Sequence, residues 1–311
     1  MAPSAVSLFS GCGGTDLGIR ELGFDIALAN DVWSVAADLY RANLPDVSVQ
    51  LGDVREVKSF PNADLLIGCY PCQGYSQGGT RNPASSLNYL YREFDRALRQ
   101  ISPKAFIVEN VAGMAHANNR TLLNNQLVRF RLAGYTVSYN VLDAKDYGLA
   151  QTRRRLFIVG VKSTLGMRYE FPSPTHGPRA GLAYTSQQEV IGGMEEWPEG
   201  QYCSEPLHWY YMSRRRRHNW NEPSACIVGH WRHVPLHPIS PPLIRIDTDH
   251  WQFQYPGPFR RLSLAECAAL QSFPSDYRWE SVRVKDGFMA AGNAVPPTIA
   301  KAIACALPDI W

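Results

Sequence analysis

The sequence lacks any long hydrophobic run. Nowhere do about 18 apolar residues follow one another, so a membrane-spanning helix is not expected. The first residues, MAPSAVSLFSGCGG, have neither the basic start nor the long apolar stretch of a signal peptide, which argues against secretion. Cysteine is sparse and odd in number, with seven residues scattered over the chain, so most thiols should be reduced rather than form a disulfide framework.

Charge is balanced over most of the chain and concentrated in one segment. The 311 residues are 45% hydrophobic and 19% charged, with a formal net charge of +3, which is typical of a globular protein. Residues 210–261 carry eight Arg, no Lys and three acids, together with five of the eight His. An excess of positive charge made of Arg favours a surface for a polyanion, although an ordinary solvated face is the alternative.

Short apolar or β-branched runs alternate with helix-like stretches through the first 160 residues. Strands are predicted at 5–10 and 25–30 and in the runs VSVQL, DLLIG, AFIVEN, TVSYNVL and RLFIVG, and helices near 16–22, 33–43, 88–100 and 119–132. Strands that alternate with helices form a mostly parallel sheet covered on both faces. The predicted fold class is therefore α/β, with a doubly wound sheet.

The composition changes near residue 166, where Pro, Gly, Trp, His and Arg become frequent and no helical periodicity extends beyond two turns. Order returns near 260, where Ser263 and Glu266 have the spacing of a capping box before the helix LAECAAL. We expect a first domain at 1–165, a small loop-rich domain inserted at 166–257, and a return segment at 258–311 that completes the first domain.

A glycine-rich turn, FSGCGG at 9–14, follows the first predicted strand. Glycine lets a ligand approach the backbone, and the start of the next helix favours negative charge. Asp31 and Asp53 follow the next two strands, where carboxylates of α/β proteins bind ribose hydroxyls or an adenine amino group. A cofactor that contains a nucleoside is therefore plausible, and a purely structural turn is an equal alternative.

Cys69 and Cys72 form a C-x-x-C pattern after the fourth strand. A zinc site is disfavoured because no second cysteine pair or close histidine pair accompanies it, and a redox dithiol usually opens a helix rather than a Gly/Ser loop. A single nucleophilic thiol at Cys72 fits better, with Cys69 buried and inert. Glu109 ends the next strand, so it should lie near Cys72 at the same sheet edge. Arg153 and Arg155 follow later and point to one face of an extended segment.

Six short motifs in order give the chain its resemblance to DNA (cytosine-5)-methyltransferases of the compact bacterial type. They are FSGCGG, Pro71–Cys72–Gln73, Glu109–Asn110–Val111, the Q-x-R-x-R of 151–155, RRLSLAECAALQSFP at 260–274 and GNAVPP at 292–297. Each string alone is modestly specific, but six in the family's order over nearly the whole chain are very specific. The resemblance implies the Rossmann-like fold of S-adenosylmethionine-dependent methyltransferases, with 1–165 and 258–311 as the catalytic domain and 166–257 as the target-recognition domain.

The resemblance also implies a mechanism. Cys72, as thiolate, would add to C6 of a cytosine flipped out of the duplex, and Glu109 would hydrogen-bond N3 and the exocyclic amine. Arg153 and Arg155 would act on the O2 side of the base and near the thiolate. No metal ion is required. The methyl donor would be S-adenosyl-L-methionine, bound by Phe9, Ser10, Gly11, Cys12, Gly13, Gly14, Asp31, Val32, Asp53, Val54, Leu90 and Asn293.

The inserted segment is similar to the recognition domains of the subset that modifies GGCC-type sites, through YMSRRRRHNWNEPSA at 211–225 and PLHP at 235–238. The resemblance implies double-stranded DNA as the partner and a monomer beside a cognate restriction endonuclease. It also implies a cytoplasmic, nucleoid-associated protein of prokaryotic or phage type. The residues expected at the DNA are Gln73, Ser76, Gln151, Arg214, Arg215, Arg216, Arg217 and Arg232.

Three other interpretations stay open at this point. An RNA cytosine-5 methyltransferase has the same chemistry, but the Cys-Phe-Thr insertion of such enzymes is absent from the recognition region. A catalytically silent DNA-binding relative has no chemical reason to keep Cys72, Glu109 and Arg155 together. A nicotinamide oxidoreductase lacks its G-x-G-x-x-G turn here and would leave the proline-cysteine-glutamine loop unexplained.

Overall fold

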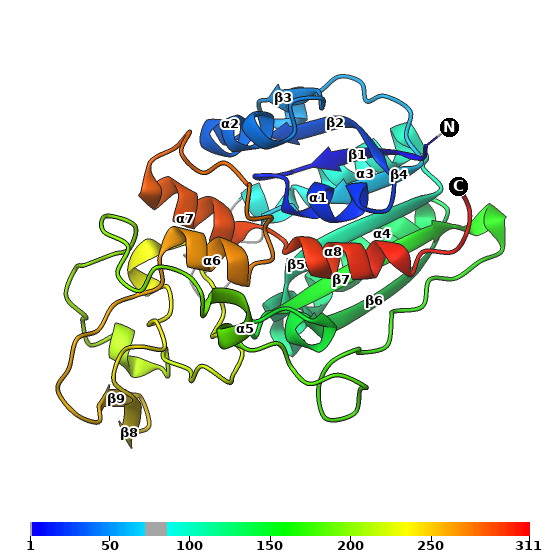
Figure 1. Cartoon of the computed structure of the whole chain (residues 1–311). Helices are drawn as coiled ribbons and strands as arrows, with labels where there is room; N and C mark the ends of the chain where they lie inside the picture. The colour runs from blue at the N-terminus through cyan, green and yellow to red at the C-terminus, as the bar shows by residue number, and fades with distance from the viewer. Residues whose placement is uncertain (1, 72–85) are drawn as a thin grey trace. The chain divides into compact units, whose positions relative to one another are not determined.

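A mixed, mostly parallel sheet forms the centre of the fold (Figure 1). The computed structural model describes residues 2–71 and 86–311, and within them seven strands form this sheet in the order β3-β2-β1-β4-β5-β7-β6. Its strands are β1 (Ser4–Leu8), β2 (Asp25–Asp31), β3 (Val49–Leu51), β4 (Leu65–Gly68), β5 (Ala105–Val111), β6 (Tyr135–Asp143) and β7 (Arg154–Lys162). The first five strands pair in parallel, and β7 runs antiparallel to β5. The predicted α/β fold class is confirmed.

The order of the strands changes direction at β1, which lies between β2 and β4. The register pairs Leu8 with Gly68 and Gly68 with Val108, so β1 and β4 end level at the carboxyl edge of the sheet, and β5 continues beyond them from Glu109 to Val111. In open parallel sheets, ligands bind in the crevice outside the carboxyl ends of the strands at such a switch point. The turns after these three strands are therefore the place to look for chemistry.

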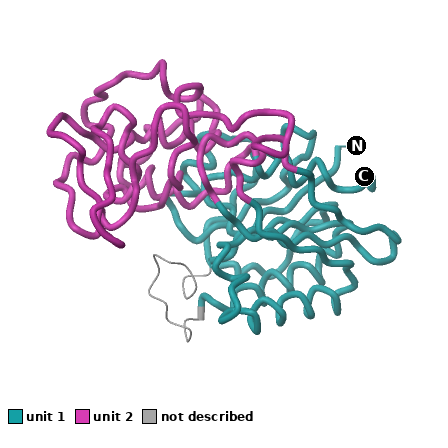
Figure 2. The backbone as a smooth tube through the Cα atoms, turned by 90° about the horizontal axis from the view of Figure 1, so that it is seen from below, with its two compact units in different colours: residues 1–142, 154–173, 299–311 teal, residues 143–153, 174–298 magenta. Residues whose placement is uncertain are grey.

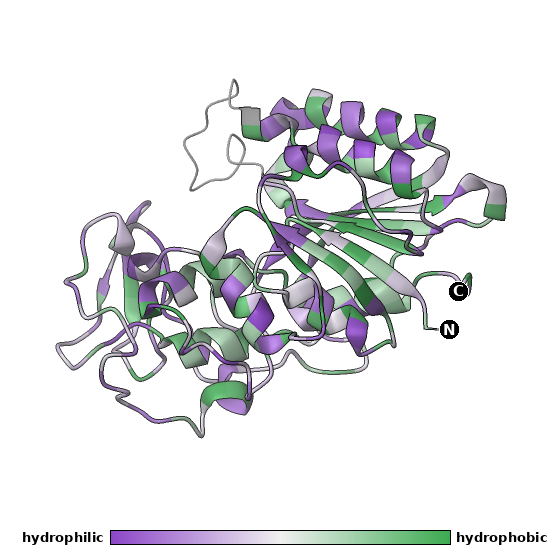
Figure 3. Cartoon of the chain, turned by 90° about the horizontal axis from the view of Figure 1, so that it is seen from above, coloured by the Kyte–Doolittle hydropathy of each residue, from purple (hydrophilic) through white to green (hydrophobic). Residues whose placement is uncertain are grey.

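Helices cover both faces of the sheet. They are α1 (Gly14–Arg20), α2 (Ser34–Asn43), α3 (Tyr91–Ile101), α4 (Arg120–Leu132) and α8 (Pro297–Cys305). Figure 1 shows α3 and α4 on one face and α1 and α8 on the other. Figure 3 shows hydrophobic and hydrophilic residues interspersed along the helices, which is the pattern of amphipathic helices. Within the described part of the chain, no helix is both long and apolar enough to cross a membrane.

The chain divides into two compact units (Figure 2). Unit 1 comprises 1–142, 154–173 and 299–311, and unit 2 comprises 143–153 and 174–298. Unit 2 contains α5 (Gln187–Ile191), α6 (Leu264–Leu270), α7 (Val284–Asn293) and the hairpin of β8 (Leu243–Asp247) and β9 (His250–Phe253). The segment 258–311 therefore supplies α8 to unit 1 but α6 and α7 to unit 2, because Leu264, Leu270 and Phe288 pack with Ile227 and Val234.

Polar contacts of buried side chains hold much of the loop-rich unit 2 together. The capping box predicted for α6 is confirmed, with Ser263 accepting from the Glu266 backbone N–H and the Glu266 carboxylate accepting from that of Ser263. The same carboxylate pairs with both terminal nitrogens of the buried Arg260, at 2.8 and 2.7 Å. Breaking such a buried pair typically costs about 3–5 kcal/mol, because one charge is left without compensation.

One carboxyl group in unit 1 is buried without a cationic partner in direct contact. Asp16, in the first turn of α1, is fully buried and accepts a hydrogen bond from the Tyr40 hydroxyl on α2 at 2.7 Å. Its other oxygen, Oδ1, has no hydrogen-bond partner. Burial raises the pKa of Asp16 from 3.8 to about 6, against the opposing effects of Tyr40, Ser7 and Arg20.

This pKa predicts a change of stability with pH. The folded state binds the Asp16 proton more tightly than the unfolded state, so its contribution is present below about pH 4 and is lost as pH rises through about 6. Between pH 4 and pH 7, the free energy of unfolding of Asp16→Asn should rise relative to that of the wild type by about 2 kcal/mol. Urea denaturation of both proteins across this range measures the difference.

Asp46→Asn is the matched control, because Arg20 holds the pKa of that exposed carboxyl below its ordinary value. It should lack the rise, since its ionised form is the one that folding favours. A free-energy difference between wild type and Asp16→Asn that stays constant from pH 4 to pH 7 would contradict the account of Asp16.

Candidate active site

The turn that follows β1 has an unusual backbone. Phe9 has a φ of +58°, followed by Gly11 at +56° and Gly13 at +84°. At Gly13 a Cβ would also lie 3.1 Å from the Tyr40 and Leu44 side chains, so only glycine fits there without strain. A positive φ at an aromatic residue costs on the order of 1–3 kcal/mol and occurs mainly at functional sites. The predicted cofactor turn thus has a strained, tightly fixed backbone.

Asp31 ties this turn to the carboxyl end of β2. Its Oδ2 accepts from the Gly11 backbone N–H and its Oδ1 from the Trp33 N–H, both at 2.8 Å. Val32 and Leu51, which flank the carboxylate, are 70% and 44% exposed. Oxygen acceptors between exposed apolar side chains suit a nucleoside, which has hydroxyl groups to bind and a flat ring to cover.

Other predicted cofactor residues differ in what they can offer. Asp53 caps the short turn η1 (Val54–Glu56) by accepting from the Arg55 backbone N–H at 2.9 Å, and the Arg55 guanidinium holds the pKa of its carboxyl below the ordinary range. The side chains of Cys12, Val54 and Leu90 are buried. Ser10 donates its hydroxyl to the Asn30 carbonyl at 3.3 Å. Any contact from Cys12, Val54 or Leu90 to a ligand would therefore use the backbone.

Packing and a hydrogen bond fix the path of the chain where it leaves β4. A Cβ at Gly68 would lie 2.4 Å from the Phe94 ring, so the strand end packs directly on α3. The next residues, 69–71, are held by Asn110, whose side-chain amide donates to the Tyr70 carbonyl at 3.0 Å. Three residues predicted from the sequence, Cys72, Gln73 and Ser76, lie outside the described residues. The last described residue before this gap is Pro71, which precedes Cys72, the predicted nucleophile, and follows Tyr70, which is hydrogen-bonded to Asn110 of β5.

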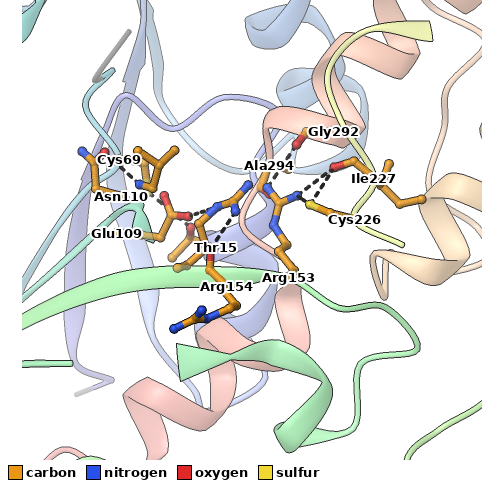
Figure 4. Close-up of polar contacts among 12 residues, drawn as sticks. Thr15, Cys69, Glu109, Asn110, Arg153, Arg154, Cys226, Ile227, Gly292 and Ala294 are labelled. Carbon is orange, nitrogen blue, oxygen red and sulfur yellow. Dashed lines mark hydrogen bonds and ion pairs between the residues drawn. The ribbon is translucent and has the colours of Figure 1, made fainter. Parts of the chain in front are cut away.

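Glu109, at the end of β5, forms an ion pair with Arg155 of β7, with Nε 2.9 Å from Oε1 (Figure 4). In the antiparallel register Arg155 lies opposite Val111 and Phe157 opposite Glu109, so the two charged side chains are diagonal neighbours on one face of the sheet. Both are mostly buried, with 12% of the Glu109 and 19% of the Arg155 side chain exposed. The structure therefore brings these two predicted residues together.

Cys69 is a described thiol at this edge, three residues before Cys72 in the sequence. Its sulfur lies 3.7 Å from the Thr15 hydroxyl, and burial together with the Glu109 carboxylate raises the pKa of the thiol well above its ordinary value (Figure 4). A thiol in this environment stays protonated at neutral pH and is a poor nucleophile. This agrees with the inert role expected for Cys69.

Arg153 and Gln151 make contacts within unit 2. The buried Arg153 guanidinium donates to the carbonyls of Ile227, Gly292 and Ala294 at 2.8–3.0 Å (Figure 4). Gln151 is also buried, and its amide contacts the Ile227 N–H, the Leu270 carbonyl and the Gln271 side chain. Both side chains connect three separate segments of unit 2, so the structure supports a positioning role for them. Asn293 is exposed at the end of α7.

The four consecutive Arg of unit 2 fall into two pairs. Arg216 donates to the carbonyls of Tyr211 and His233, and Arg217 to those of Pro238 and Ser240. Arg214 and Arg215 are exposed, and Arg215 pairs with Glu222 at 2.8 Å. The exposed Arg232, predicted at the DNA, pairs with Glu205. Arg216 and Arg217 thus support the fold of unit 2, whereas Arg214 and Arg215 reach the solvent.

Sequence reasoning missed the roles of Arg260 and Arg261. Both are buried, and Arg261 donates to the carbonyls of Arg232, Cys203 and Glu205. Four of the eight Arg in 210–261, namely Arg216, Arg217, Arg260 and Arg261, therefore bind the backbone of unit 2 itself. The charge count alone had assigned all eight to a surface. The spacing of Ser263 and Glu266 was the available signal, because the carboxylate that completes a capping box also binds Arg260.

A shallow hollow of about 420 Å³ lies within unit 2 beside Lys145, Arg215, His218, Asn221 and Glu222. Its lining includes cationic side chains, Lys145 and Arg215, and one anionic side chain, Glu222. Among residues 2–71 and 86–311, no group of three His, Cys, Asp or Glu side chains is placed to hold a metal ion.

Comparisons with known proteins agree on one family. Residues 4–308 match the family model for C-5 cytosine-specific DNA methylases. The Type II methyltransferase M.BsuRI of Bacillus subtilis is 34% identical over 97% of this chain and 78% of its own length, and M.FnuDI of Fusobacterium nucleatum is 33% identical over 96% and 92%.

Solved structures share the fold. A DNA modification methyltransferase encoded within an E. coli prophage superposes with a TM-score of 0.72 at 20% identity, covering 97% of both chains. The Dnmt2 methyltransferase of S. pombe gives 0.69 at 14% identity, again over 97% of both. The match along the sequence, the methyltransferase fold and the paired Glu109 and Arg155 lead to one conclusion: the chain belongs to the C-5 cytosine-specific DNA methylase family and is a DNA (cytosine-5)-methyltransferase of the restriction-modification type.

Proposed function

We propose that this enzyme methylates C5 of a cytosine flipped out of a short specific duplex site, through a covalent bond between Cys72 and C6. The observation that carries the proposal is the Glu109–Arg155 pair at the end of β5. Asn110, the neighbour of Glu109, holds the Tyr70 carbonyl, so the carboxylate lies on the strand beside the segment that leads to Cys72. An acid fixed next to a nucleophile suits attack on a pyrimidine ring.

The methyl donor in this proposal is S-adenosyl-L-methionine, which supplies an electrophilic methyl group when bound. The residues at the carboxyl ends of β1 and β2 fit such a molecule. Asp31 offers carboxylate oxygens to ribose hydroxyls, and the exposed Val32 covers one side of a base. Gly11, in the turn after β1, has open space where a Cβ would stand, so a ligand can approach the backbone there. Asp53, Leu90 and Asn293 stay predictions from the resemblance.

The chemistry on cytosine is assigned to this chain's own side chains. Addition of the Cys72 sulfur to C6 forms a C–S bond and moves the electrons of the C5=C6 bond toward C5 and N3. Glu109 stabilises that charge by hydrogen bonding at N3 and at the exocyclic amine. Arg155 fixes the orientation of the Glu109 carboxyl through their ion pair. After C5 has been alkylated, loss of its proton and cleavage of the C–S bond restore the aromatic ring and the thiolate.

Unit 2 is proposed to recognise the DNA. The motif string at 211–225 favours a GGCC site, and Arg214 and Arg215 are the members of the Arg run that remain exposed for phosphates or guanine edges. Arg153 and Gln151 would act through the segments that they connect, at 227, 270–271 and 292–294. The enzyme is proposed to work as a monomer beside a restriction endonuclease of the same specificity.

The first prediction compares the wild type with Glu109→Gln on unmethylated DNA of known sequence. With S-adenosylmethionine present, the wild type should convert cytosine to 5-methylcytosine within GGCC. Glu109→Gln should methylate the same site about 100- to 10,000-fold more slowly, because an amide cannot transfer a proton to N3 as negative charge develops there. Single-turnover rates measure the loss, and bisulfite sequencing identifies the site.

Binding of the same duplex, which should be retained by Glu109→Gln, separates lost catalysis from lost recognition. Transfer of methyl groups to tRNA rather than DNA would contradict the proposed substrate. Unimpaired methylation by Glu109→Gln would contradict the proposed mechanism. Methylation at another DNA site would overturn GGCC alone.

The two Arg pairs of unit 2 should respond differently to substitution. Replacing Arg214 and Arg215 by Ala should weaken DNA binding at low salt and reduce the slope of log Kd against log salt by about one for each phosphate that these side chains neutralise. Thermal unfolding should barely change. Replacing Arg216 and Arg217 should instead lower the melting temperature, because their guanidiniums donate five hydrogen bonds within the protein.

The titration of binding against salt, run beside thermal unfolding for both double variants, separates the two roles. An unchanged salt slope for the Arg214 and Arg215 variant would mean that these side chains form an ordinary solvated face.

A further inference from the structure

The 50–57 segment of unit 1 carries two neighbouring polar groups that suit the edge of an adenine ring. The Asp53 carboxylate is a hydrogen-bond acceptor, and Arg55 holds its pKa below the ordinary range, so it is ionised at neutral pH. The hydrogen bonds within η1 are donated by the N–H groups of residues 55–57, so the Val54 N–H takes no part in them. Adenine presents a donor at its amino group and an acceptor at N1, which an acceptor beside a donor matches.

Little regular structure holds this segment in place. The strand β3 has only three residues, η1 is a single turn, and residues 57–63 after it are neither helix nor strand. The side-chain amide of the buried Asn30 fixes the first part, because it donates to the Gln50 carbonyl at 2.9 Å and to the Gly52 carbonyl at 3.1 Å. The turn η1 lies beyond these two bonds.

Arg96, on α3, connects η1 to that helix. Its Nη2 donates to the Val54 carbonyl and its Nη1 to the Val57 carbonyl, both at 2.9 Å. Its Nε donates to the Glu93 carboxylate of the same helix at 2.8 Å, and the guanidinium lies 5.2 Å from the centre of the buried Phe60 ring. Because the planar fork of an Arg side chain is held at three points, it fixes the backbone on both sides of residues 55 and 56.

The pair with Glu93 alone does not account for Arg96, since an ion pair of this kind on a helix surface contributes little to stability. Arg99, three residues later on α3, makes the same kinds of contact elsewhere. It pairs with Asp95 and donates to the Arg129 carbonyl on α4, so it connects two helices. Both bonds by which Arg96 reaches outside α3 go instead to the turn that follows Asp53.

We propose that Arg96 is a positioning residue for the cofactor: it holds the Asp53 carboxylate and the Val54 N–H in the arrangement that selects adenine over other purines. The inference rests on the proposed methyl donor, S-adenosyl-L-methionine. Hypoxanthine differs from adenine at this edge, where it presents an acceptor at O6 and a donor at N1. A site that fixes an acceptor beside a donor therefore rejects hypoxanthine, and a site in which the two groups move rejects it less.

The test measures binding of S-adenosylhomocysteine and S-inosylhomocysteine, which differ only in the base, by titration calorimetry. The wild type should bind the inosine compound at least about 100-fold more weakly than the adenosine compound. In Arg96→Lys, which keeps the charge but cannot bridge two carbonyls and Glu93, this ratio should fall about tenfold, mainly through weaker binding of S-adenosylhomocysteine. Arg99→Lys is the matched control on the same helix and should keep the wild-type ratio.

The ratio separates positioning from a general loss of stability. Partial unfolding lowers the apparent affinity for both compounds by the same factor, so it leaves their ratio unchanged. Glu93→Gln is a second variant, because it removes the acid that orients the guanidinium and leaves Arg96 in place. Its ratio should fall in the same direction by a smaller factor of about two to three.

An unchanged ratio in Arg96→Lys, or the same fall in Arg99→Lys, would overturn the role of Arg96 and leave the proposed function standing. Equal binding of the two compounds by the wild type would likewise overturn the selection of adenine at this edge. Failure of the wild type to bind S-adenosylhomocysteine at all would instead contradict the proposed cofactor and, with it, this inference.

Discussion

The parallel pairing of β4 with both β1 and β5 is the constraint on which the catalytic unit depends. Because these strands run in the same direction and in this register, three stretches of chain that are far apart in the sequence meet at one edge. The first contains the strained Phe9, the second leads from Cys69 toward Cys72, and the third is the end of β5, which carries Glu109. A shift of one strand by a single residue would turn Glu109 to the opposite face, so hydrophobic packing of the strands fixes the chemistry.

Unit 2 is organised by a different kind of interaction. Its loops have few regular backbone partners, and buried guanidiniums take over the role of satisfying carbonyl oxygens. Arg153, Arg260 and Arg261 donate to carbonyls at 196, 203–205, 227–232 and 292–294, and Glu266 compensates the charge of Arg260. Fixed loops of this type present exposed side chains such as Arg214 and Arg215 in one arrangement.

Much of unit 1 could be predicted from the sequence, because its signals are local. Apolar runs followed by glycine or acidic residues marked β1, β2 and β5, and parallel pairing then placed Glu109 near the segment of Cys72. The inner roles of Arg216, Arg217 and Arg260 could not be predicted in this way. An Arg in a loop has the same local pattern whether it meets a phosphate or a carbonyl of its own chain, and only tertiary packing decides between the two.

The most direct test of the account is covalent trapping on a duplex that carries 5-fluorocytosine at the target position, with S-adenosylmethionine present. Fluorine at C5 cannot leave as a proton does, so an enzyme that attacks C6 should remain attached to the DNA. The account predicts an adduct in which mass spectrometry finds the cytosine joined to Cys72 and methylated at C5. The absence of an adduct on a duplex whose cytosine form is methylated, or an adduct on Cys69, would contradict it.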